Sequence, residues 1–171
     1  MFRSLRPLSH ALRQKPTSVS STFGRCFSSN IVSSPHAMPA DFKDSIGKNV
    51  PHMVMENFLR ADVKSKTALV CGGSGQSRTF GELHSNTHKF AHSLVDMGVG
   101  KGDCIGLISP NNINYFTAFQ GIGLTGATST PINPLYTEHE IEYQLSVTQS
   151  KIVIAHPLCF EKASNVAKKL H

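Results

Sequence analysis

The glycine-rich segment Gly121-Ile122-Gly123-Leu124-Thr125-Gly126 has the spacing that most directly suggests chemistry. It matches G-x-G-x-x-G, the pattern in which a strand-to-helix turn holds a dinucleotide pyrophosphate against a helix N-terminus. That use requires a strand before the glycines and a helix after them. Here a helical pattern precedes the glycines and a strand pattern follows. We therefore interpret the segment as a helix-to-strand junction where small residues permit close packing.

A second glycine cluster, Gly72-Gly73-Ser74-Gly75, could in principle surround a phosphate group. It lacks the lysine that a P-loop places directly after its glycines to meet the phosphates. It also lies between two short strand-like stretches, where a tight hairpin turn is the usual arrangement. The sequence thus predicts a turn at this position.

Four neighbouring residues, Glu138, His139, Glu140 and Glu142, have side chains suited to metal binding or to acid–base catalysis. Acidic residues in a first helical turn are also favoured by the helix dipole. Thr137 and Glu140 have the spacing of a capping box, in which each side chain binds the other residue's backbone N–H. Because no second pair of ligands is apparent, we interpret the cluster as the start of a helix.

Three histidines, His84, His88 and His92, recur every four residues and share one stripe of an expected helix. Because much of that stripe is polar, we expect a solvent-facing row, for which nickel or zinc binding would be incidental. The four cysteines are scattered without Cys-x-x-Cys spacing, and the chain has no Gly-x-Ser-x-Gly elbow. The residues alone therefore predict no catalytic, cofactor-binding or metal-binding site.

The elements around these residues alternate between strands and helices, which favours an α/β fold with βαβ units and a parallel sheet. A second capping box, Thr79 to Glu82, begins a helix that ends near Gly98. The final strand is apolar throughout, so we expect it to be buried on both faces. The strands are expected at residues 67–71, 77–79, 104–109, 127–132 and 151–155. Helices are expected within 51–61, from the Thr79 capping box to near Gly98, through Tyr115–Phe119 after N-cap candidates in Ser109–Asn112, from the Thr137 capping box, and over Phe160–Leu170.

Charge is distributed unevenly along the 171 residues, whose formal net charge is +6. All acidic residues lie at or beyond Asp41, and the chain after residue 40 is nearly neutral, which disfavours a nucleic-acid partner.

Residues 1–30 are rich in Arg and Ser and resemble a transit peptide, with a cleavage-like Arg25-Cys26-Phe27-Ser28 sequence, followed by a linker at 31–48. We expect import into the mitochondrial matrix, with plastid import or a disordered tail as the alternatives. No apolar run is long enough to span a membrane.

Several short motifs between Asn49 and Leu170 occur in an order that resembles the AMP-forming acyl-activating enzymes, which include acyl-CoA synthetases, 4-coumarate–CoA ligases and firefly luciferase. These motifs are Arg78-Thr79-Phe80-Gly81-Glu82-Leu83, Gly98-Val99, Lys101-Gly102-Asp103, Pro110-Asn111, Asn133-Pro134-Leu135-Tyr136-Thr137, Glu140-Ile141 and Gln144-Leu145. The resemblance implies that residues 49–171 form an incomplete parallel-sheet βαβ scaffold, the start of the large N-terminal domain of AMP-binding ligases.

The resemblance also implies a reaction for the full-length enzyme. Such enzymes use ATP and magnesium to adenylate a carboxylic acid, fatty or aryl, with release of pyrophosphate, and then pass the acyl group to coenzyme A. The family's Ser/Thr/Gly-rich loop with its lysine comes downstream of the position equivalent to Leu170, as do the adenine-binding segments and the catalytic lysine. No functional residue can therefore be transferred to this sequence, and none of these cofactors is expected to bind this part alone.

Three hypotheses follow. In the first, the chain is an N-terminal fragment of a mitochondrial acyl-CoA synthetase and is inactive by itself. In the second, it is a genuine short protein that uses the same scaffold for binding or assembly. The third, a Rossmann-type oxidoreductase, is disfavoured by the reversed context of the glycines. For a fragment, we also expect an exposed strand edge at residues 151–155 and self-association through exposed apolar surface.

Overall fold

The structure is a computed structural model that describes residues 48–170. The expected transit peptide at 1–30, and all but the last residue of the expected linker at 31–48, lie outside the described residues. The described chain belongs to one compact unit, Gly47–His171. Within it, no helix combines the length and apolar character needed to cross a membrane.

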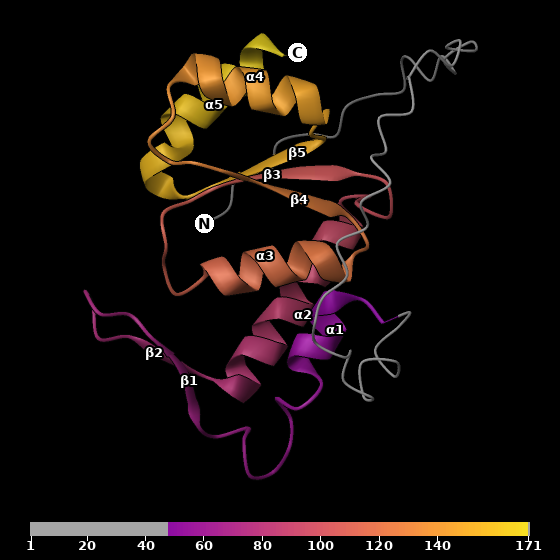
Figure 1. Cartoon of the computed structure of the whole chain (residues 1–171), viewed down its shortest axis with the longest axis vertical. Coiled ribbons are helices and arrows are strands. Elements are labelled where there is room, and N and C mark those ends of the chain that lie inside the picture. Colours follow the sequence, from indigo (N-terminus) through magenta and orange to yellow (C-terminus); the bar gives the residue numbers. More distant parts are fainter. Residues whose placement is uncertain (1–47, 171) are drawn as a thin grey trace, which may run out of the picture. The chain divides into compact units, whose positions relative to one another are not determined.

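A three-stranded parallel sheet forms the centre of this unit (Figure 1). Its strands are β3 (Cys104–Ile108), β4 (Thr128–Ile132) and β5 (Ile152–Ala155), arranged in the order β4-β3-β5. The parallel sheet expected from the alternating pattern is thus confirmed. The chain leaves β3 for β4 on one side and then crosses back over β3 to β5. Right-handed crossovers in opposite directions require helices on opposite faces of the sheet.

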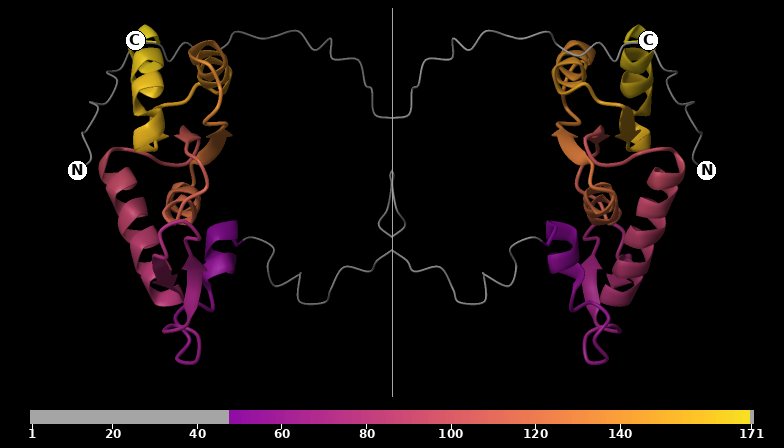
Figure 2. Two further views of the ribbon diagram at one scale, coloured as in Figure 1. Left: turned by 90° about the vertical axis from the view of Figure 1, so that its left-hand side faces the viewer. Right: turned by 90° about the vertical axis from the view of Figure 1, so that its right-hand side faces the viewer.

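Two helices cover each face of the sheet (Figures 1 and 2). α2 (Phe80–Asp96) and α3 (Tyr115–Leu124) lie on one face, and α4 (Glu138–Thr148) and α5 (Phe160–Lys169) on the other, with the 3₁₀ turn η2 (Pro157–Cys159) before α5. The buried residues of the first core are Leu94, Val99, Ile105, Leu107, Ile122 and Ala127. Those of the second core are Ile108, Ile132, Ile141, Leu145, Cys159, Ala163 and Val166.

Both predicted capping boxes are present. The Thr79 hydroxyl accepts a hydrogen bond from the Glu82 N–H at 3.2 Å, and a Glu82 carboxylate oxygen accepts one from the Thr79 N–H at 2.8 Å. The corresponding distances for Thr137 and Glu140 are 3.4 and 2.8 Å. Each carboxylate accepts from the backbone N–H and then from the hydroxyl of its threonine, and these bonds lower the pKa of Glu82 and Glu140 because they stabilise the ionised form.

The turn between α2 and β3 is held by a lysine from far along the chain. Gly98 has a φ of 80°, which suits the residue after a helix C-cap. The Lys151 ammonium donates to the Gly98 carbonyl at 2.7 Å and to Asp103 Oδ2 at 2.9 Å. Gly100 N–H donates to the same carboxylate oxygen at 2.9 Å. The Gly98–Asp103 motif therefore forms a turn that fixes the start of β3 beside the start of β5.

The N-terminal part of the unit contains α1 (Val50–Met55) and an antiparallel hairpin of β1 (Thr67–Val70) and β2 (Ser77–Thr79). The hairpin confirms the turn predicted at the second glycine cluster. α1 ends at Met55, whereas a helical segment was expected over residues 51–61; turns occupy the rest.

Two further expectations need correction. The final strand is covered on both faces, as expected, since Val153 and Ala155 pack against one core and Ile152 and Ile154 against the other, but all four positions of β5 keep some exposure. The first turn of α3 begins after Asn114, which forms no side-chain cap, although Ser109–Asn112 contained the expected cap residues. The Asn112 amide group instead donates to Ser109 Oγ and to the Pro110 carbonyl.

Candidate functional site

The glycines of the segment 121–126 are packing positions. A Cβ added at Gly121 would lie 2.6 Å from Phe90 Cδ1 and 3.3 Å from the Thr87 carbonyl oxygen, both on α2. A Cβ at Gly123 would lie 2.7 Å from Pro51 Cγ on α1. The two glycines therefore let α3 approach α2 and α1 closely, as the sequence predicted. They lie near the end of α3 rather than before the N-terminus of a helix, so they do not fit a dinucleotide pyrophosphate.

The Gly72–Gly75 turn is open on every side. No atom outside the immediate chain neighbours lies within 4 Å of a Cβ placed at Gly72, Gly73 or Gly75. The donors in this turn are directed at the sulfur atom of Cys71. Hydrogen bonds from the Ser74 hydroxyl, and then from the backbone N–H groups of Ser74 and Gly73, lower the pKa of the Cys71 thiol. No lysine directly follows the glycines, and the guanidinium of Arg78, three residues further on, donates to the Ser77 carbonyl at 2.9 Å. The turn therefore does not fit the triphosphate of ATP.

The acidic cluster at the start of α4 is used in helix capping and in contacts with α5. Glu140 completes the capping box described above. Glu138 accepts hydrogen bonds from Asn165 at 2.7 Å and from Lys169 at 3.2 Å, and these lower its pKa. Within the described residues, no group of three or more His, Cys, Asp or Glu side chains is arranged to hold a metal ion. Glu138 therefore holds α4 against α5, and Glu140 caps α4.

The histidine stripe of α2 is less exposed than predicted. His84 and His88 are half-buried and their rings lie 4.3 Å apart between centroids, while His92 is exposed. Burial lowers the pKa of His84. The pKa of His88 is lowered by burial first and then by the positive charges of His84, His52 and His92. This environment favours the neutral rings.

The carboxyl edge of the sheet is the place where open α/β sheets usually bind ligands, next to the strand at which the order reverses. Here the loops after β3, β4 and β5 meet. Lys162 of α5 donates to the Tyr136 carbonyl at 3.1 Å and to the Pro134 carbonyl at 3.4 Å, and so fixes the loop after β4. After β5, the His156 ring accepts a hydrogen bond from Leu158 N–H at 3.2 Å. The polar side chains at this edge thus stabilise the loops themselves.

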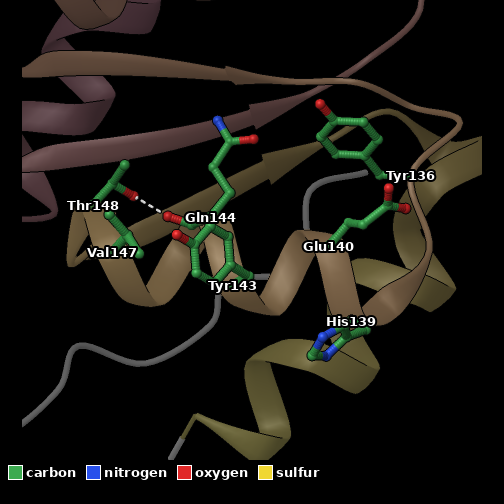
Figure 3. A pocket seen from close by; sticks show the side chains of 7 residues that line it. All are labelled: Tyr136, His139, Glu140, Tyr143, Gln144, Val147 and Thr148. Atoms are coloured by element: carbon green, nitrogen blue, oxygen red, sulfur yellow. Dashed lines mark hydrogen bonds between the residues drawn. The ribbon is translucent and has the colours of Figure 1, made fainter.

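A groove of about 460 Å³ runs along α4 (Figure 3). We call it the α4 groove; it is lined by Tyr136, His139, Glu140, Tyr143, Gln144, Val147 and Thr148. The Gln144 amide group connects it to β4 by donating to Thr130 Oγ1 at 2.8 Å and to the Pro131 carbonyl at 3.0 Å. The Thr148 hydroxyl donates to the Gln144 carbonyl, the contact drawn in Figure 3.

The α4 groove has aromatic and hydrogen-bonding groups but no reacting pair. Its carboxylate, Glu140, is held in the capping box, and Thr148 is bonded to the backbone of its own helix. Sequence reasoning did not find this groove, although its lining residues recur at the i, i+3, i+4 and i+7 spacing of one helix face, which was the available signal. Within residues 48–170, the candidate residues of the sequence thus form helix caps, turns and packing positions, beside an aromatic groove on α4.

The fold and sequence can now be placed among known proteins. Residues 59–171 match the model of the family described as "AMP-binding enzyme". The chain belongs to this family.

Relatives within the AMP-binding family include plant and bacterial CoA ligases. The chain is 34% identical over 110 residues to 4-coumarate–CoA ligase 3 of Arabidopsis thaliana, a match that covers 64% of this chain and 20% of the relative. It is 31% identical over 132 residues to a long-chain-fatty-acid–CoA ligase of Bacillus subtilis (strain 168), covering 75% and 21%. The chain therefore spans about a fifth of the length of these curated relatives.

Solved structures of the same family share the fold. An anthranilate CoA ligase in complex with anthranoyl-AMP superimposes with a TM-score of 0.65 at 26% identity, over 71% of this chain and 23% of that one. A long-chain-fatty-acid–CoA ligase from Archaeoglobus fulgidus gives the same TM-score and identity, over 71% and 26%. The mixed α/β scaffold with a parallel sheet thus matches the N-terminal part of AMP-binding ligases, as the resemblance implied.

Proposed function

We propose that this chain is the N-terminal part of an acyl-CoA synthetase. In the full-length enzyme, ATP would activate a carboxylic acid as its adenylate, and coenzyme A would then take up the acyl group as a thioester. The observation that carries the proposal is the family match over residues 59–171, together with relatives named as CoA ligases. Because those relatives are named for 4-coumarate and for fatty acids, the substrate class is an aryl or fatty acid.

The role proposed for this part is structural. Its glycine-rich segments are used for packing and for a turn, and neither fits ATP. The residues that would bind ATP, magnesium and coenzyme A therefore belong to polypeptide outside this sequence. We expect the 171-residue chain by itself to be inactive.

Two measurements test the proposal. The first is the sequence of the transcript beyond the His171 codon: an open frame that continues into a Ser/Thr/Gly-rich loop with a lysine supports it, and an immediate stop codon contradicts it. The second is carboxylate-dependent ATP–pyrophosphate exchange by the purified chain, with a full-length CoA ligase as the positive control. Exchange above a matched blank would refute the structural role.

We also propose that residues 1–30 direct import into the mitochondrial matrix, with plastid import as the alternative where plastids exist. The support is the acid-free, Arg- and Ser-rich composition before Asp41. A reporter fused to residues 1–40 should be imported and cleaved near Phe27. A reporter that stays in the cytosol would contradict this.

A second candidate function is a non-catalytic binding or assembly module on the same scaffold, which self-associates. The support is the apolar and aromatic surface that the scaffold exposes, which includes Tyr143, Val147 and Phe160 at 69%, 66% and 51% exposure. A stop codon after His171, together with a stably folded product, would support this function over the first.

A further inference from the structure

Two imidazole rings lie next to each other on α2. His84 and His88 are four residues apart, so their side chains lie one above the other on the same side of the helix. Their ring centroids are 4.3 Å apart, and the ring planes are tilted by 39°. Each histidine directly follows a buried residue, Leu83 or Thr87, and therefore lies at the margin of the packed face of α2.

The helix that carries the two rings is fixed in place. The Thr79–Glu82 capping box holds its first turn, and Leu83 and Thr87 are buried. α3 packs closely against α2 where Gly121 meets Thr87 and Phe90. Ligands on a packed helix keep their separation better than ligands on a loop. The two rings therefore form a preformed pair, whose spacing can be compared with that of two ligands of one metal ion.

The spacing of the rings fits such a pair of ligands. A metal ion about 2.0 Å from a nitrogen of each ring would lie roughly 3.2 Å from each ring centroid. With a right angle at the metal, the centroids are then about 4.5 Å apart, whereas the tetrahedral angle of a zinc site gives about 5.2 Å. The observed 4.3 Å is nearer to the right angle, which Cu²⁺ and Ni²⁺ prefer. Rotation about the Cβ–Cγ bond is soft, so one nitrogen of each ring can be directed at the ion.

The surroundings of the pair favour the form of histidine that binds metal. A histidine binds a metal ion through a neutral ring nitrogen. Burial lowers the pKa of both rings, and the positive charges of His84, His52 and His92 lower the pKa of His88 further. Both side chains still keep part of their exposure, so an ion in solution can reach them.

We propose that His84 and His88 bind one Cu²⁺ or Ni²⁺ ion, with one nitrogen from each ring. Within residues 48–170, no third His, Cys, Asp or Glu side chain joins them in an arrangement that could hold a metal. The site therefore has two protein ligands, and water completes the coordination of the ion. Because structural sites use protein ligands at all positions, this is an open and reversible site. It is independent of the acyl-CoA synthetase reaction.

Isothermal titration of the 171-residue chain with Cu²⁺ measures the affinity. His84→Gln and His88→Gln should each weaken binding by about tenfold or more, because the remaining ring has lost its partner in the chelate. The double variant should bind hardly more weakly than either single variant, since the chelate is already lost at the first substitution. Circular dichroism of each variant verifies the fold.

His92→Gln is the matched control, because His92 lies four residues after His88 on the same helix and is exposed. His139→Gln on α4 is a second control, and both should leave the affinity unchanged. A measurement on the wild-type chain needs no substitution. In its NMR spectrum, a small fraction of an equivalent of Cu²⁺ should broaden the ring signals of His84 and His88 before those of the other histidines.

Single variants that bind Cu²⁺ as tightly as the wild type would overturn the proposal. A loss of affinity in His92→Gln that His84→Gln does not share would also overturn it. So would broadening that appears equally at His139, because it would show single imidazole rings binding the ion without a chelate. None of these measurements involves ATP, a carboxylic acid or coenzyme A, so the failure of this site and the failure of the proposed function are distinguishable.

Discussion

The two glycine-rich segments have similar compositions and serve different purposes. In α3, Gly121 lies directly against α2, so that an added Cβ would lie 2.6 Å from Phe90 Cδ1. In the hairpin turn, nothing approaches Gly72 within 4 Å, and Gly75 is needed for its φ of 69°. Glycine is thus used for its small size in one place and for its backbone freedom in the other. Neither use provides a phosphate site, and only the surrounding residues tell the two apart.

The largest effect is expected where the packing is tightest. Gly121→Val should destabilise the fold by about 2 to 3 kcal/mol, because the added side chain must displace Phe90 and the backbone of Thr87. Urea unfolding followed by circular dichroism measures the change. In a double-mutant cycle, Phe90→Ala should recover part of the loss caused by Gly121→Ala. A stable Gly121→Val variant would show that α3 does not need close contact with α2.

An intermediate effect is expected in the hairpin. Gly75→Ala should weaken the turn by about 1 kcal/mol, because an L-residue is strained at this positive φ. Hydrogen exchange of the Gly75 and Cys71 amides, which bond within the turn, reports the loss. Gly72→Ala is the matched control in the same turn and should change nothing measurable. Equal effects at the two positions would mean that φ is not what Gly75 provides.

Both capping boxes and the hairpin could be predicted from sequence because their contacts join residues that are close along the chain. Thr79 and Glu82 need only each other. The strand order β4-β3-β5 could not be predicted, because it depends on which face α4 covers, and that depends on packing. The same holds for the contacts of Lys151 with Asp103 and of Gln144 with Pro131. In the candidate site, the roles of the glycines were predicted from their neighbours along the chain. The α4 groove and the partial burial of His84 and His88 were not predicted.

The smallest effect concerns pH and distinguishes the α2 region from the hairpin. The pKa values of His84 and His88 are lowered in the folded protein, which therefore binds fewer protons than the unfolded chain. Their contribution to stability is complete above the ordinary histidine pKa of about 6.5 and is lost as the pH falls below it. Because both rings are only half-buried and keep part of their hydration, the loss should be only ~0.5 kcal/mol.

Urea unfolding at several pH values between 7.5 and 5 measures this loss. His88→Gln should reduce the pH dependence, whereas the control His139→Gln, on α4, should not. Hairpin amides should show no pH-dependent loss of protection beyond the ordinary change in exchange chemistry. A hairpin that loosens in acid along with α2 would show that the two regions open together.

The central position of β3 has a consequence for the order in time in which the sheet forms. Ile105 pairs with Ser129 and with Ile152, so the first partner is 24 residues away and the second 47. Closing the longer loop costs only about 0.6 kcal/mol more. During synthesis, however, the 23 residues between those partners take about 1 to 5 s to appear. For that interval one edge of an almost wholly apolar strand has no partner inside the molecule, and a chaperone at the ribosome would meet the nascent chain at β3.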